Sequence, residues 1–131
     1  MGKEDLIKRI DDFLIELSMS YETPAEGMWV IHDEFENIDN IVVSLEDPLV
    51  IFRIRLMEIP DSGKDEFFEQ LLRLNVTSLI HGAYALEDNH VVIVDTLQAE
   101  NLDLNEFRAS IEAIGMAIIN DYKELSRFVK K

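Results

Sequence analysis

The stretch from Leu71 to Ile93 places the end of a helix directly before a two-stranded hairpin. Leucines close an apolar helical pattern near residue 74, and two apolar segments follow, separated by Glu87-Asp88-Asn89. Asp and Asn tolerate the left-handed backbone angles that a tight turn needs. We therefore predict a helix that ends near residue 74, followed by antiparallel strands at 79–86 and 90–97.

The segment 49–57 is a strong strand whose two faces differ in character. Side chains alternate between the faces of a strand, so odd and even positions form separate sets. The purely apolar set is expected to face the core and consists of Val50, Phe52, Ile54 and Leu56. The other set combines apolar side chains with two arginines, as an exposed or partner-covered sheet face would, and consists of Leu49, Ile51, Arg53, Arg55 and Met57.

The remaining elements follow from the same periodicities. Helices are expected at residues 4–18, from about Ser62 to 74, and at 103–129, where Asp103 and Glu106 form a pair like a capping box. Strands are expected at 28–32 and 40–45, while residues 20–27 are interpreted as a loop because they contain Thr23-Pro24 and Gly27.

The resulting order α-β-β-β-α-β-β-α predicts a single domain over residues 1–131. Short connections favour antiparallel pairing of neighbouring strands. We therefore expect an α+β two-layer sandwich, with a five-stranded, mostly antiparallel sheet and helices packed on one face.

The charge balance excludes several classes of function. Twelve Lys and Arg stand against 27 Asp and Glu, which gives a formal net charge of −15. Such acidity opposes binding to nucleic acids and anionic membranes, and favours basic or neutral partners. No apolar run approaches the ~20 residues of a membrane span. The chain has no cysteine, which excludes disulfides and thiol catalysis and suits a cytoplasmic location.

Groups that could carry chemistry are sparse. His32-Asp33-Glu34-Phe35-Glu36 places metal-ligand types close together, but a solvated strand end gives the same pattern. His81 and His90 flank the hairpin without a third ligand. There is no glycine-rich phosphate loop and no recognisable nucleophile beside a histidine. We expect no catalytic residue, no metal and no cofactor. A small-ligand or metal-binding sensor built from scattered His and Asp/Glu is the alternative.

The second half of the chain resembles the type III secretion chaperone-like fold, which includes the YbjN family and the CesT/Tir chaperones. The resemblance covers roughly residues 48–120. The residues that carry it are Leu71, Leu72, Asn75, Gly82, Tyr84, Leu86, Val91, Val92, Ile93, Leu97, Asp103, Leu104 and Phe107. It implies a small, acidic, cytoplasmic, bacterial homodimer that binds an extended segment of a client protein without ATP and without catalysis.

Two surfaces are candidate interfaces on this basis. The first is the mixed face of the 49–57 strand, which could receive a client; the alternative is that Arg53 and Arg55 pair with neighbouring acids and only keep the face soluble. The second is an additional apolar band on the last helix, either buried in the same chain or covered in a homodimer. We assign this dimer interface to Ala113, Met116, Ala117 and Ile119.

Overall fold

The computed structural model describes residues 2–33, 38–79 and 81–128, and these residues form three helices and six strands. Along the chain the elements are α1 (Lys3–Glu16), β1 (Ser20–Ala25), β2 (Met28–Asp33), β3 (Ile38–Glu46), β4 (Leu49–Glu58), α2 (Lys64–Thr77), β5 (Ala83–Glu87), β6 (His90–Gln98) and α3 (Leu104–Ser126).

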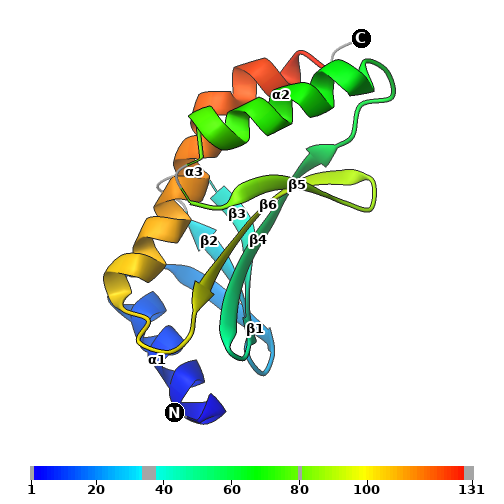
Figure 1. Ribbon diagram of the computed structural model, residues 1–131. Coiled ribbons are helices and arrows are strands. Elements are labelled where there is room, and N and C mark those ends of the chain that lie inside the picture. Colours follow the sequence, from blue (N-terminus) through cyan, green and yellow to red (C-terminus); the bar gives the residue numbers. More distant parts are fainter. Residues whose placement is uncertain (1, 34–37, 80, 129–131) are drawn as a thin grey trace.

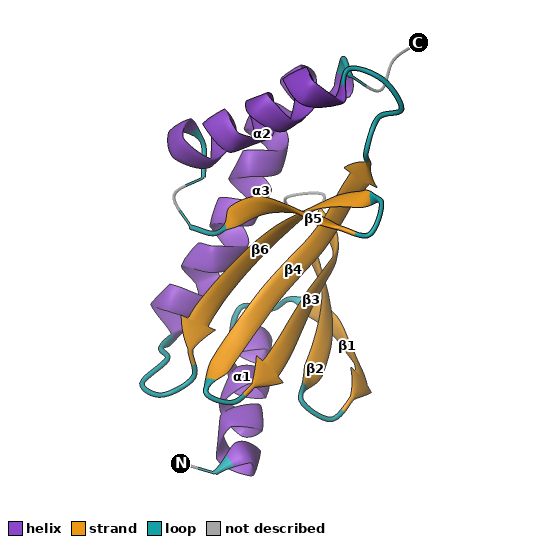
Figure 2. Ribbon diagram, turned by 45° about the vertical axis from the view of Figure 1, so that its right-hand side comes forward, coloured by secondary structure: helices purple, strands orange, loops and turns teal. Residues whose placement is uncertain are grey.

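The strands form one sheet in the order β1-β2-β3-β4-β6-β5, and every neighbouring pair is antiparallel. β3 and β4 are the central strands, with β1 and β5 at the two edges (Figure 2). The predicted α+β class and the antiparallel sheet are therefore confirmed, but the predicted number of five strands is one too few.

The missing strand is β1, which lies in the segment that we interpreted as a loop. Pro24 cannot donate a backbone hydrogen bond, and edge strands tolerate this loss. The pairing of β1 with β2 shifts register between Glu22 and Ala25, next to the proline. Gly27, with φ 77°, then makes the turn into β2. Pro24 and Gly27 therefore do interrupt regular structure, but they belong to an irregular edge strand and to the turn that follows it.

The helices form the second layer. α1 and α3 lie along one face of the sheet, and α2 lies across the end of α3, next to β5 (Figures 1 and 2). Trp29 of β2 donates a hydrogen bond from Nε1 to Asp11 of α1 at 2.8 Å, which fixes α1 against the sheet. None of the helices in the described residues lies on the opposite face of the sheet (Figure 2).

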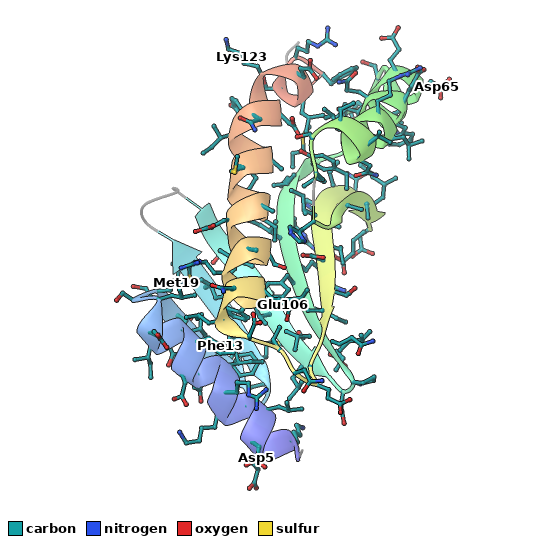
Figure 3. The ribbon with its side chains drawn as sticks, turned by 60° about the vertical axis from the view of Figure 1, so that its left-hand side comes forward. Asp5, Phe13, Met19, Asp65, Glu106 and Lys123 are labelled. Carbon is teal, nitrogen blue, oxygen red and sulfur yellow. The ribbon has the colours of Figure 1, made fainter. Side chains whose placement is uncertain are left out.

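The core lies between these two layers. Val50, Phe52 and Ile54 are buried there, as predicted, and Leu56 is half-buried against the same core. The Phe52 ring packs on Phe107 of α3, with 5.3 Å between the ring centroids. Phe13 of α1 packs on Phe107 at 5.4 Å and lies beside the first turn of α3 (Figure 3).

The predicted start of α3 is confirmed in detail. The Asp103 carboxylate accepts a hydrogen bond from the backbone N–H of Glu106, and the Glu106 side chain accepts one from the backbone N–H of Asp103. This capping box satisfies two helix-end donors. The second helix, predicted from about Ser62, begins at Lys64, after Gly63, which is in the left-handed region at φ 70° and provides no side-chain cap.

We predict that Phe52→Ala lowers the free energy of unfolding by ~3–5 kcal/mol, because it opens a cavity beneath α3. Chemical denaturation followed by circular dichroism measures this change. Thr96→Ala, an exposed position on the neighbouring strand, is the matched control and should stay within ~0.5 kcal/mol of the parent. A midpoint for Phe52→Ala close to that of the parent would contradict its place in the core.

Candidate functional site

The sheet face opposite the helices is the main candidate site, and we call it the open sheet face. Strand register defines its members, because directly paired residues point to the same side. Ile51 pairs with Ser44 and Thr96, so these side chains share this face, whereas Phe52 pairs with Val43 and Asp95 on the helix side. The central members are Met28, Val30, Val42, Ser44, Leu49, Ile51, Arg53, Arg55, Ala83, Ala85, Val92 and Val94.

The open sheet face is unusually apolar for a surface that none of the described helices covers. Eight of its apolar side chains are half-buried. Val92 is only 1% exposed, although it is not part of the core that lies between the sheet and the helices. An antiparallel sheet with one solvated face normally alternates apolar-in and polar-out. A contiguous apolar sheet surface of this kind is typical of an interaction site.

Arg53 and Arg55 give this face its positive charge. Arg53 Nε lies 3.8 Å from Glu87 Oε1, and both side chains are 42% exposed. Arg55 is exposed and makes no ion pair or hydrogen bond with any side chain in the described parts of the chain. The alternative reading, in which the arginines pair with neighbouring acidic side chains, therefore applies to Arg53. The five N–H donors of the Arg55 guanidinium remain available to another molecule.

Met57 does not belong to the open sheet face, which corrects the sequence-based assignment. β4 and β6 shift register between Arg55 and Met57, because a β-bulge places an extra residue on β4. Met57 therefore pairs with Val91 and packs against the core from the helix side. Strict alternation would have placed it beside Ile51, and the bulge reverses its direction.

The predicted dimer residues of α3 separate into three groups. Met116 and Ile119 are 58% and 60% exposed, and Ala113 is half-buried. Ala117 is 1% exposed and lies in the core of its own chain, so it cannot belong to a surface. The prediction for Ala117 was wrong, because the helix turns that position toward the sheet.

The histidines do not converge. The register places Ala83 opposite Val94 and Glu87 opposite His90, so His81 and His90 lie toward opposite ends of β5. His32 Nε2 lies 3.6 Å from Glu22 Oε2 on the neighbouring strand. Glu34 and Glu36 fall outside the described residues. Within the described residues, no group of three or more His, Asp or Glu is arranged to hold a metal ion.

A polar network that the sequence did not reveal fixes the β5–β6 hairpin to the helices. The Asn75 side chain accepts a hydrogen bond from the backbone N–H of Tyr84 at 2.6 Å and donates one to the Tyr84 carbonyl at 3.4 Å. The buried Asp121 carboxylate accepts hydrogen bonds from Ser78 Oγ at 2.9 Å and from the Tyr84 hydroxyl at 2.5 Å. Asn75 and Tyr84 had been noted only as part of the family resemblance.

Comparison with known proteins decides the family. The CesT_Tir_1 family model matches residues 3–131, which is nearly the whole chain. The chain belongs to the CesT_Tir_1 family. The resemblance inferred from residues 48–120 is therefore confirmed and extends to the N-terminal helix. No curated protein sequence matches the chain.

Solved structures share the fold. YbjN from E. coli, described as a putative transcription regulator, is 18% identical, covers 89% of this chain and 91% of its own, and superposes with a TM-score of 0.66. A chain of the HopA1–SchA chaperone–effector complex is 11% identical over 100% of this chain and 99% of its own, with a TM-score of 0.64. A chain of the heterodimeric ExoU–SpcU complex from the type III secretion system of Pseudomonas aeruginosa is 18% identical, with 92% and 94% coverage and a TM-score of 0.58.

None of the helices in the described residues is both long and apolar enough to cross a membrane.

The Tyr84 hydroxyl gives a pH-dependent prediction. Burial raises its pKa above the ordinary value of about 10, and the hydrogen bond to Asp121 and the negative charge of Asp121 raise it further. Folding therefore favours the protonated phenol, so this contribution to stability is complete below about pH 10 and decreases as the pH rises above it.

We predict that, above pH 10, the free energy of unfolding decreases more steeply in the parent than in Tyr84→Phe, which has no phenol at position 84 to titrate. The difference in slope should reach up to ~1.4 kcal/mol per pH unit. Urea unfolding at several alkaline pH values measures the difference. Tyr122→Phe, on an exposed tyrosine, is the control and should retain the parent's pH dependence. Identical slopes for the parent and Tyr84→Phe would rule out this linkage.

Proposed function

We propose that the chain is a cytoplasmic, chaperone-like module without catalytic activity that binds an extended segment of a client protein on its open sheet face. One observation carries the proposal: α1 and α3 pack on one face of the sheet, and the other face, which none of the described helices covers, presents a half-buried apolar surface. Membership of the CesT_Tir_1 family supports it, as does the shared fold with two structures of chaperone–effector and secretion-system complexes.

The surface suits an extended segment with apolar side chains. Leu49 and Ile51 offer non-directional contact, and Arg53 and Arg55 follow on the same face at two-residue spacing. An extended segment also repeats every two residues, so its apolar side chains can follow this spacing. The arginines restrict register by requiring an acceptor opposite them, and they oppose open-ended stacking of bare sheets.

The charge of the molecule biases the choice of client. The formal net charge of −15 attracts basic segments over long range and repels acidic ones. We therefore expect basic or neutral clients, with backbone carbonyls or isolated carboxylates as the acceptors for Arg55.

We further propose a homodimer in which α3 of each subunit contributes the row of apolar side chains formed by Ala113, Met116 and Ile119, which we call the dimer stripe. Met116 and Ile119 are large, exposed and one helical turn apart, and Ala113 continues the stripe toward the N-terminus. Exposed apolar side chains on the outer surface of a helix that is otherwise packed on a sheet indicate a second contact.

Binding can be tested with fluorescent peptides of one length that alternate valine and threonine and carry lysine, serine or glutamate at both ends. We expect affinity to decrease in the order lysine, serine, glutamate. Ile51→Glu should weaken binding of the neutral serine peptide at least about tenfold, which is ~1.4 kcal/mol, and Arg53→Ala should weaken it less.

Leu72→Glu, an equally drastic change at a 67% exposed position on α2, is the matched control and should bind like the parent. Circular dichroism verifies that each variant is folded. Parent-like binding by a folded Ile51→Glu variant would exclude the open sheet face as the client site.

Sedimentation at micromolar concentration tests the dimer. We expect the parent to sediment as a dimer and the double variant Met116→Glu, Ile119→Glu to sediment as a folded monomer, because a stable interface buries at least ~1,000 Å² and does not tolerate two unpaired charges. Val76→Glu, 84% exposed on α2, should remain dimeric. A monomeric parent would refute the proposed dimer.

A further inference from the structure

A groove separate from the open sheet face lies on the helix side of the sheet, beside the C-terminal half of α3. Its volume is about 490 Å³, within the range of ligand-binding pockets. The β-bulge of β4 supplies one wall with Leu56 and Met57, and α3 supplies the other. The lining residues are Leu56, Met57, Tyr84, Ile118, Asp121, Tyr122, Leu125 and Ser126.

The groove has one charged wall group, the carboxylate of Asp121. This side chain is 5% exposed and accepts hydrogen bonds from the hydroxyls of Ser78 and Tyr84, which are both neutral donors. Within the described residues, no Lys, Arg or His forms an ion pair with it. Buried carboxylates usually have a cationic partner, and two carboxylate oxygens can accept about four hydrogen bonds.

The rest of the lining suits a long apolar stem that ends in a cation. Leu56, Met57 and Ile118 provide apolar walls on which the methylene groups of a lysine or arginine can pack. Tyr122 is 68% exposed at the groove, and its ring face attracts a cation. The net charge of −15 draws basic groups toward the whole molecule.

We propose that this groove binds a basic side chain, lysine or arginine, of a partner polypeptide, with the stem on Leu56, Met57 and Ile118 and the cation directed to Asp121 and the ring of Tyr122. The proposal goes beyond the binding of a client on the open sheet face, since the groove lies on the other side of the sheet. It adds a recognition site for charge, where the open sheet face recognises extended apolar sequence.

The groove is also distinct from the proposed dimer stripe. Ala113, Met116 and Ile119 do not line the groove. Tyr122 lies one helical turn after Ile119 and is exposed at the edge of the groove, so the two surfaces are neighbours on α3.

The test uses short acetylated, amidated peptides with glycine on both sides of a central lysine, norleucine or glutamate, titrated into ¹⁵N-labelled protein. We expect the lysine peptide to shift the amide signals of Met57, Ile118 and Tyr122, with an affinity about tenfold higher than that of the norleucine peptide. The glutamate peptide should cause no shift there. Equal affinity of the lysine and norleucine peptides, or no shift at the groove, would overturn the proposal.

Variants locate the interaction. Asp121→Asn should reduce the affinity for the lysine peptide to that for the norleucine peptide. If this variant does not fold, Met57→Lys decides, because its own ammonium group would occupy the groove and abolish lysine-peptide binding. Val76→Lys adds the same charge on α2 and should leave binding unchanged. Full binding by a folded Met57→Lys variant would overturn the proposal.

Ile51→Glu separates this site from the proposed client site. It should leave the lysine-peptide shifts at Met57 and Ile118 unchanged while it weakens the valine–threonine peptides. The proposal for the open sheet face and the proposal for the groove are thus tested with different peptides and at different residues, so one can fail while the other holds.

Discussion

The contact between Phe52 of β4 and Phe107 of α3 joins the sheet layer to the helix layer. Phe107 follows directly after the capping box of Asp103 and Glu106, so the start of α3 is fixed by local hydrogen bonds and by the core at the same place. Phe13 brings α1 onto the same ring. The apolar faces of α1 and α3 are both buried on this side, and α2 packs next to β5 and α3, so none of the described helices covers the other side of the sheet.

This one-sided packing creates the open sheet face. In most two-layer proteins the solvated face of the sheet is polar. Here valine, leucine and isoleucine side chains occupy the centre of that face, and an arginine without a described partner lies among them. Such a surface costs solubility in an isolated molecule, and the net charge of −15 offsets that cost by keeping molecules apart. An exposed apolar face on a highly charged molecule is typical of a surface that binds another protein.

The β-bulge between Arg55 and Met57 separates the two proposed sites. Before the bulge, β4 presents Ile51, Arg53 and Arg55 to the open sheet face; after it, Met57 joins Leu56 on the helix side, beside Asp121. One strand therefore contributes cations to one surface and apolar contacts to a groove with an acidic wall. In the two proposals, the open sheet face binds an extended apolar segment and the groove binds a basic side chain, and a single long client segment can carry both.

The sequence by itself determined the elements that depend on neighbours in the chain. The helices α1 (Lys3–Glu16) and α3 (Leu104–Ser126), the capping box, the hairpin turn at Asp88 and the buried set of Val50, Phe52 and Ile54 all follow from local periodicity and turn chemistry. The family resemblance also rested on such local patterns, and the family match confirmed it.

Only the tertiary structure decided which side Met57 faces, that β1 is an edge strand, and that Ala117 lies in the core. Each depends on a partner that is distant in sequence: β6 for the bulge, β2 for the edge strand and the sheet for the inner side of α3. The network of Tyr84 with Asp121 joins residues 37 positions apart. A sequence pattern records the preferences of single residues and their close neighbours, whereas register, bulges and buried polar pairs are fixed only when distant segments pack together.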